Sequence, residues 1–274
     1  MIVFPNCKIN LGLYIPGKRP DGYHNIETVF YPVPFFDVLE IIQSINPAQD
    51  CELFLSGIQI ESDAENNLCV KAYHLLKKNF PQLPTVKIYL HKTIPAGAGL
   101  GGGSANGAFM VKLMNNKFNL KLSQQQLLNY ALALGSDCPF FIINKPCFAQ
   151  QRGEILEPAE LSLQGYKLIL VNPGIHINTG WAFTQVGYSE GNKIKNIIKE
   201  PVENWKEKLS NEFELPVFKN YPEIKIIKDR LYEQGALYAS MSGSGSSVYG
   251  IFKRNAVIDH KLFLAHYFIK ELML

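Results

Sequence analysis

A glycine-rich stretch between a predicted strand and a predicted helix constrains this chain more than any other feature. Residues 95–106 read PAGAGLGGGSAN and contain five glycines, followed by Ser104. Apolar residues alternate in the preceding segment 86–94, and residues 105–115 carry an apolar face with helical spacing. Glycine lets backbone amides turn towards a ligand, and a helix N-terminus adds donors without partners. The stretch therefore predicts a phosphate-binding loop, with Ser104 as the N-cap residue of the helix, in preference to a flexible surface turn.

Two better-known phosphate loops do not fit this stretch. A Walker A loop needs a lysine directly after its glycines, and none follows here. The pattern GxGxxG occurs at Gly97, Gly99 and Gly102, but the acidic residue that a dinucleotide site needs about 20 positions later is missing. Between Glu65 and Asp137 the chain contains eight lysines and no acidic residue. This charge pattern favours a polyanionic ligand over a nicotinamide ribose.

Composition describes an ordinary globular protein. The chain has 274 residues, of which 47% are hydrophobic and 19% charged, and its net charge of +3 is too small to predict a nucleic-acid partner. Its five cysteines are scattered without a CxxC pair, which indicates reduced thiols in the cytoplasm. No basic and apolar leader opens the chain, and no apolar run approaches the roughly 20 residues of a membrane helix. We therefore expect a cytoplasmic protein without a membrane partner.

Several polar residues lie in an apolar frame near the start of the chain. Residues 2–15 are predicted to form a strand that places Asn6, Lys8 and Asn10 on one face. Taken alone, such a polar face predicts exposure to solvent. Tyr23 and His24 follow the turn-forming pairs Pro-Gly and Asp-Gly, so they are expected on or just after a surface loop.

The rest of the chain alternates helices and strands. A helix over 124–134 is predicted between Ser123 and Gly135, and Asp137 then occupies a short turn before an apolar run, 140–143, predicted as a strand. A strand over 166–171, a helix over 223–234 and a Gly/Ser stretch over 242–247 between two strands follow. A Gly/Ser turn of this kind is often a plain hairpin, but two glycine-rich stretches in one chain favour a shared ligand cleft.

Four segments together resemble the GHMP kinases. They read KINLGLYIPGKRPDGYHNIETVF, PAGAGLGGGSANGA, GSDCPFFI and SGSGSSVYGIF in chain order. The resemblance implies an α/β (α+β) fold of two domains with the active site in the cleft between them. An N-terminal ATP-binding domain would span residues 1–152 and a C-terminal domain residues 153–274. Many family members read GGGSSDAA where this chain reads GGGSANGA, so a hydroxyl and a carboxylate are missing at positions 105 and 106.

The resemblance also implies a reaction. ATP, with Mg²⁺, would donate its γ-phosphoryl group to the 2-hydroxyl of a cytidyl diphosphate sugar alcohol in the non-mevalonate route to isoprenoids. DGYH, GLGGGS and GSDCPFF are typical of family members with this substrate. Both ligands are polyanions, which agrees with the acid-free lysine run.

The family's functional residues map onto this chain as follows. Lys8 and Asp137 would be catalytic: Asp137 would orient the acceptor hydroxyl and take its proton, and Lys8 would keep Asp137 ionised and offset charge on the transferred group. The ATP-binding residues would be Lys92, near the adenosine, and the loop residues Pro95, Ala96, Gly97, Ala98, Gly99, Leu100, Gly101, Gly102, Gly103, Ser104 and Ala105. The residues that bind the acceptor would be Asn10, Tyr23, His24, Thr179 and Phe183. Tyr23 and Phe183 would sandwich the cytosine, and His24 would contact its edge.

Three alternatives stay open at this point. A GHMP kinase acting on mevalonate or homoserine is the nearest, and DGYH argues against it. A single-stranded nucleic-acid binder would use the lysines, but it needs aromatic residues between them and gives Asp137 no function. A GHMP-fold protein without catalysis is opposed by the presence of both Lys8 and Asp137.

Overall fold

The chain forms two compact units. The computed structural model describes residues 1–44, 51–59, 63–189 and 194–274. The first unit contains residues 1–7, 35–96 and 101–145, and the second contains residues 8–34, 97–100 and 146–274. This grouping differs from a single cut after residue 152, because residues 8–34 and 97–100 pack with the C-terminal part of the chain. The two family domains, 1–152 and 153–274, stay a prediction.

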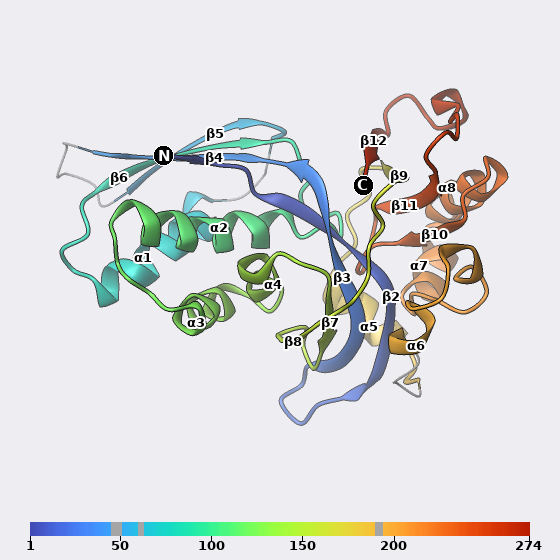
Figure 1. Cartoon of the computed structure of the whole chain (residues 1–274), viewed down its shortest axis with the longest axis horizontal. Helices are drawn as coiled ribbons and strands as arrows, with labels where there is room; N and C mark the ends of the chain where they lie inside the picture. Colours follow the sequence, from blue (N-terminus) through green and yellow to red (C-terminus); the bar gives the residue numbers. More distant parts are fainter. Residues whose placement is uncertain (45–50, 60–62, 190–193) are drawn as a thin grey trace. The chain divides into compact units, whose positions relative to one another are not determined.

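The first unit combines a four-stranded sheet with helices (Figure 1). The strands, in their order across the sheet, are β1 (Ile2–Val3), β4 (Val38–Gln43), β6 (Val86–Lys92) and β5 (Cys51–Gly57). β5 runs parallel to β6, and the other neighbours are antiparallel. The helices are η1 (Ala64–Asn66), α1 (Leu68–Asn79), α2 (Gly102–Lys117), α3 (Gln124–Leu134) and α4 (Cys138–Ile143).

The core of the first unit lies between this sheet and its helices. Alternate residues of β6 are buried, as its period of two predicts, and they pack with the apolar faces of α1 and α2. Side chains set the helix starts: Asn67 caps α1 by accepting from the Cys69 amide, and Ser123 forms a capping box with Gln126 at the start of α3. The predicted start of the 124–134 helix after Ser123 and its end at Gly135 are confirmed.

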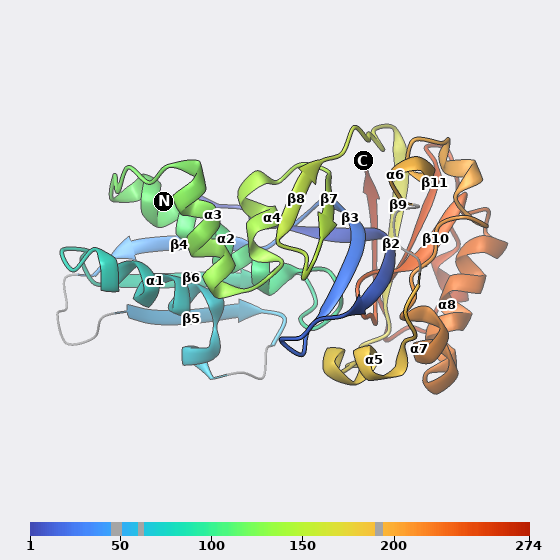
Figure 2. The same cartoon turned by 90° about the horizontal axis from the view of Figure 1, so that it is seen from below.

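The second unit contains two sheets, both visible in Figure 2. One has the order β2 (Asn6–Lys18), β3 (His24–Phe36), β7 (Cys147–Gln150) and β8 (Ile155–Pro158). The other is antiparallel, with the order β10 (Tyr238–Met241), β11 (Val248–Lys253), β9 (Tyr166–Asn172) and β12 (Phe268–Met273). The helices are α5 (Thr179–Gln185), α6 (Ile194–Ile197), η2 (Val202–Asn204), α7 (Glu214–Asn220), α8 (Pro222–Glu233) and η3 (His260–Leu262).

The core of the second unit joins α8 to β9, β10 and β11. Ile224, Ile227 and Leu231 form one face of α8 and are fully buried against the sheet. The residues 242–247 connect β10 and β11, which pair in antiparallel register from Met241 and Val248 outwards. The two strands predicted on either side of the second glycine-rich stretch are therefore confirmed.

Three local predictions were wrong. The run 140–143 belongs to the helix α4 and not to a strand, because a short buried apolar run suits either state and Pro139 favours a helix start. Ser104 lies inside α2, whose N-cap residue is Gly101. The polar face of the first long strand is buried: Asn6, Lys8 and Asn10 are each at most 4% exposed.

Among the helices of the described residues, none combines the length and the apolar composition needed to cross a membrane.

Candidate active site

The helix that follows the first glycine-rich stretch begins inside it. Gly101, at φ 69°, is in the left-handed region and is the N-cap residue of α2, and Ala105 donates to its carbonyl oxygen at 2.8 Å. The amides of the first turn have no acceptor within the helix. Gly103 is exposed, and apart from its chain neighbours and the backbone of its own helix, no heavy atom of the described residues lies within 4 Å of the place a Cβ would take. The start of α2 therefore offers backbone donors and positive potential to an anion.

The preceding residues, 97–100, pack against the loop 242–247 within the second unit. The Ser242 hydroxyl donates to the carbonyl oxygen of Gly99 at 2.8 Å, and the Ser247 amide donates to that of Ala98 at 3.2 Å. Gly99 has a φ of 76°, and a Cβ there would lie 1.9 Å from the carbonyl oxygen of Ser242. A side chain at this position is excluded by both conformation and space. The structure therefore brings the two glycine-rich stretches into direct contact.

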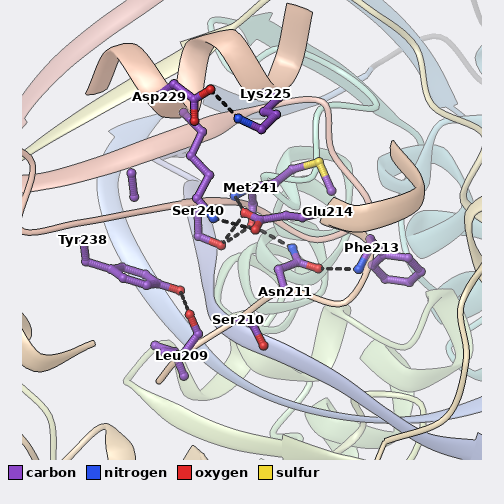
Figure 3. Close-up of polar contacts among 12 residues, drawn as sticks. Leu209, Ser210, Asn211, Phe213, Glu214, Lys225, Asp229, Tyr238, Ser240 and Met241 are labelled. Atoms are coloured by element: carbon purple, nitrogen blue, oxygen red, sulfur yellow. Dashed lines mark hydrogen bonds and ion pairs between the residues drawn. The ribbon is translucent and has the colours of Figure 1, made fainter. Parts of the chain in front are cut away.

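A buried polar network contacts the end of β10, as Figure 3 shows, and the start of the loop 242–247. Asn211 donates from Nδ2 to the carbonyl oxygens of Met241 and Gly243, both at 2.8 Å. Glu214, at the start of α7, accepts from the Met241 amide at 2.8 Å and from Lys228 Nζ at 2.6 Å. The sequence analysis missed these residues. Their segment, NEFE, has the composition of a solvated loop, so burial could not be inferred from it.

Lys8 and Asn10 form a buried pair on β2. Lys8 Nζ donates to Asn10 Oδ1 at 2.5 Å and lies 5.0 Å from the centre of the Phe30 ring. Asn10 in turn donates from Nδ2 to Thr28 Oγ1 at 3.0 Å and from its amide to the Ser242 hydroxyl at 3.3 Å. The lysine ammonium is thus hydrogen-bonded to an asparagine that contacts the second glycine-rich stretch.

Asp137 occupies the N-cap position of α4, in the first unit, and is half-buried. The pKa of the neighbouring Cys138 shows which groups lie near Asp137. Burial and, to a smaller extent, the charge of Asp137 raise the pKa of the Cys138 thiol to about 12, while a hydrogen bond with the Ser104 side chain acts in the opposite direction. Asp137 therefore belongs to the same region as the first turn of α2. Lys8 belongs to the other unit, so its pairing with Asp137 stays a prediction.

The aromatic residues expected around a cytosine lie in the second unit. The Phe183 ring stacks on the His24 imidazole, with 4.7 Å between ring centres and 10° between planes, and meets the Phe213 ring edge-on. Tyr23 is 53% exposed, and its ring centre lies 3.9 Å from the guanidinium carbon of Arg152. The structure thus brings His24 and Phe183 together, while Tyr23 pairs with an arginine that the sequence analysis did not single out.

Two other predicted acceptor-binding residues, His24 and Thr179, also have defined surroundings. Burial, together with the charge of Lys18, lowers the pKa of His24, so the imidazole is neutral at pH 7 and carries one donor and one acceptor. Thr179 begins α5, and its hydroxyl lies 2.9 Å from the Ser244 hydroxyl. The predicted acceptor-binding residue Thr179 therefore contacts the second glycine-rich stretch.

The lysine-rich run is spread over the strands and helices of the first unit. Lys92 is buried, forms an ion pair with Asp37 and donates to Asn106 Oδ1 at 2.9 Å. Lys71 donates to the side chain of Asn66, at the end of η1, and Lys112 Nζ lies 4.9 Å from the centre of an aromatic ring of its own helix. Lys92, expected near the adenosine, thus directs its charge into the core of the unit.

A metal site built by protein ligands alone is not found in the described residues, where no three His, Cys, Asp or Glu side chains are grouped to hold an ion. Mg²⁺ in phosphoryl-transfer enzymes usually takes most of its ligands from phosphate oxygens and water, with one or two side chains. Ser104 and Asp137 provide such oxygen atoms near the start of α2, so these residues fit an ion carried by a nucleotide.

Comparison with known proteins agrees with this arrangement. The family models GHMP kinases N terminal domain and GHMP kinases C terminal match residues 67–145 and 194–262. The 4-diphosphocytidyl-2-C-methyl-D-erythritol kinase of Bacteroides fragilis is 55% identical over 253 residues, which cover 92% of each chain. The enzyme of the same name from Cytophaga hutchinsonii is 48% identical over 263 residues, which cover 95% of this chain and 96% of the relative.

Solved structures give the same result. A crystal structure of 4-(cytidine 5'-diphospho)-2C-methyl-D-erythritol kinase matches with a TM-score of 0.78 and 29% identity, over 92% of this chain and 90% of that one. The mevalonate kinase of Methanococcus jannaschii matches with a TM-score of 0.72 at 14% identity, over 100% of this chain and 98% of that one, which shows the fold alone. The chain belongs to the GHMP kinase family, within the group of 4-diphosphocytidyl-2-C-methyl-D-erythritol kinases.

Proposed function

We propose that this protein transfers the γ-phosphoryl group of ATP to the 2-hydroxyl of 4-diphosphocytidyl-2-C-methyl-D-erythritol, a step of the non-mevalonate route to isoprenoids. The observation that carries the proposal is the identity of 45–55% with seven kinases of this name over most of the chain. The five cysteines are all free thiols, which supports a cytoplasmic location for the reaction.

The triphosphate would bind at the start of α2. Phosphoryl transfer has a loose transition state, so the protein contributes mainly by positioning groups and neutralising charge. Backbone donors of the first turn, from Gly102 to Ser104, would hold the phosphates, and the exposed position of Gly103 leaves room for their approach. Ser104 and Asp137 would hold Mg²⁺ together with the phosphate oxygens, and the ion would supply positive charge there.

The acceptor hydroxyl would lie between Asp137 and Lys8. Asp137 would orient this hydroxyl and take its proton as the bond to phosphorus forms. Lys8 would keep Asp137 ionised and offset the charge of the transferred group. The hydrogen bond from Lys8 to Asn10 supports this assignment, since it holds the ammonium in a defined direction. Asn10 then serves the substrate through Lys8 as well as directly.

Phe183 and its stacked partner give a test of the cytosine site. Phe183→Ala is expected to raise the KM for the cytidyl substrate about tenfold or more, because base stacking on an aromatic ring contributes about 1–3 kcal/mol. The KM for ATP should stay close to the wild-type value. In the bound state the base would take the place of the His24 imidazole on the Phe183 ring, and His24 would turn its donor and acceptor to the edge of the base.

The control for this variant is Phe54→Ala, which removes an aromatic residue stacked on Tyr89 in the first unit. Steady-state kinetics with each substrate varied in turn would separate the two KM values. A folded Phe183→Ala enzyme with an unchanged KM for the cytidyl substrate would mean that the base binds elsewhere.

The proposed activity is tested by following ADP release with three acceptors. The cytidyl substrate should be turned over, while mevalonate and homoserine should give rates near the background without acceptor. Preference for mevalonate or homoserine would instead support the rival activities considered from the sequence.

A further inference from the structure

Asp37 is a fully buried residue between β3 and β4, and the donors to its carboxylate lie at the two ends of the first glycine-rich stretch. Its Oδ1 accepts from the amides of Thr93, at 2.8 Å, and Ile94, at 3.0 Å. Its Oδ2 accepts from Asn106 Nδ2 at 2.9 Å and from the ammonium of Lys92. The four donors come from the end of β6, the two residues after it and the second turn of α2.

Through these contacts the Asp37 carboxylate binds both ends of the glycine-rich stretch. Thr93 and Ile94 are the residues through which the chain leaves β6, and Asn106 lies in the helix by which it leaves the stretch. Lys92 closes a triangle, since its ammonium binds the Asp37 carboxylate and also donates to Asn106 Oδ1 at 2.9 Å. The start of α2 packs closely against these residues, since a Cβ on Gly102 would lie 2.9 Å from Ile94 Cγ2 and 3.4 Å from Lys92 Nζ.

A contribution to folding stability is a weak explanation for the buried ion pair of Asp37 and Lys92. Lys92 is 2% exposed and Asp37 is not exposed at all, so both charges have lost their hydration. Well-packed apolar residues often stabilise a core as much as a buried ion pair does. What an apolar pair does not provide is a single acceptor that fixes two backbone amides and a helix side chain in a defined direction.

We propose that Asp37, Lys92 and Asn106 are positioning residues for ATP, which hold the entry to the glycine-rich stretch and the start of α2 in the geometry that binds the phosphates. Lys92 thus serves the nucleotide from inside the first unit, by compensating Asp37, and its ammonium does not contact the adenosine. This inference rests on the proposed kinase function, because it assumes that the nucleotide phosphates bind at α2.

Two double variants that differ in one side chain test the proposal. Asp37→Asn with Lys92→Met removes both charges but keeps an oxygen acceptor for the Thr93 and Ile94 amides. Asp37→Leu with Lys92→Met also removes both charges and leaves these amides without the acceptor. The Kd for ATP, measured by calorimetry, should stay within about threefold of wild type in the first and rise about tenfold or more in the second.

Asn106→Leu provides an independent measurement if the Asp37→Leu double variant does not fold. It detaches α2 from the carboxylate but leaves the ion pair and both amide contacts in place. The KM for ATP should rise by about fivefold or more, while the KM for the cytidyl substrate should not change. Lys167→Met is the control for lost stability, since it breaks an ion pair with Glu271 at 2.7 Å in the second unit. Its melting temperature should fall with no change in KM for ATP.

The outcomes separate this inference from the proposed function. A wild-type protein that binds no ATP would overturn both. An active wild type whose folded Asn106→Leu variant binds ATP with unchanged affinity would overturn the inference alone. The same holds if the two double variants, measured below their melting temperatures, have equal affinities for ATP.

Discussion

Asp137→Asn is expected to lower kcat by about 10²- to 10⁴-fold, the usual contribution of a positioned general base. The substitution keeps the size of the side chain and its place before α4, but it removes the group that would accept the proton of the substrate hydroxyl. ATP binding should be retained, since the phosphates would be held by backbone donors of α2. Steady-state kinetics and ATP calorimetry on the same preparation measure both effects.

Asp229→Asn is the matched control for this variant. Asp229 is an exposed carboxylate that pairs with Lys225 one helical turn away, an interaction of small energetic weight. Its removal should leave kcat unchanged. Turnover by Asp137→Asn within about threefold of wild type would exclude Asp137 as the catalytic base.

Gly99→Ala is expected to weaken ATP binding by at least about tenfold. The substitution introduces a Cβ at 1.9 Å from the carbonyl oxygen of Ser242, at a φ of 76° that suits glycine. The loop 97–100 or the loop 242–247 must then move, which breaks the hydrogen bond from the Ser242 hydroxyl to the Gly99 carbonyl. A loss of about 1.4 kcal/mol in binding free energy corresponds to a tenfold rise in the Kd.

Gly187→Ala is the matched control, since no heavy atom of the described residues beyond its two chain neighbours lies within 4 Å of the added methyl group. It should change neither the Kd for ATP nor the melting temperature. A Gly99→Ala protein that binds ATP with wild-type affinity would mean that the contact between the two glycine-rich stretches has no part in nucleotide binding.

The regular elements were predictable because their signals are local. The helix 124–134 carries its own capping residue, Ser123, and ends at a glycine, and the alternation in β6 matches its burial. The helix α4 was not predictable, since its apolar run is as short as a strand and buried on all sides.

The site residues that belong to a sequence motif could be predicted. Those whose role depends on burial in the folded protein could not. The glycine-rich stretch predicts a phosphate-binding loop from its glycine content alone. Asp37 gives no such signal, because a single aspartate between two strands has the appearance of a turn residue until the fold encloses it. Lys8 and Asn10 present the same difficulty: a polar face on a strand predicts solvent exposure, and only the tertiary structure buries it.

The central claim is that this chain phosphorylates one hydroxyl of a cytidyl diphosphate sugar alcohol. The most direct test is ³¹P NMR of the product formed from ATP and 4-diphosphocytidyl-2-C-methyl-D-erythritol by the purified protein. We expect one new phosphomonoester signal, from a phosphate on the 2-hydroxyl, formed in an amount equal to that of ADP. ADP and inorganic phosphate without a new ester, or a phosphate on another hydroxyl, would contradict it.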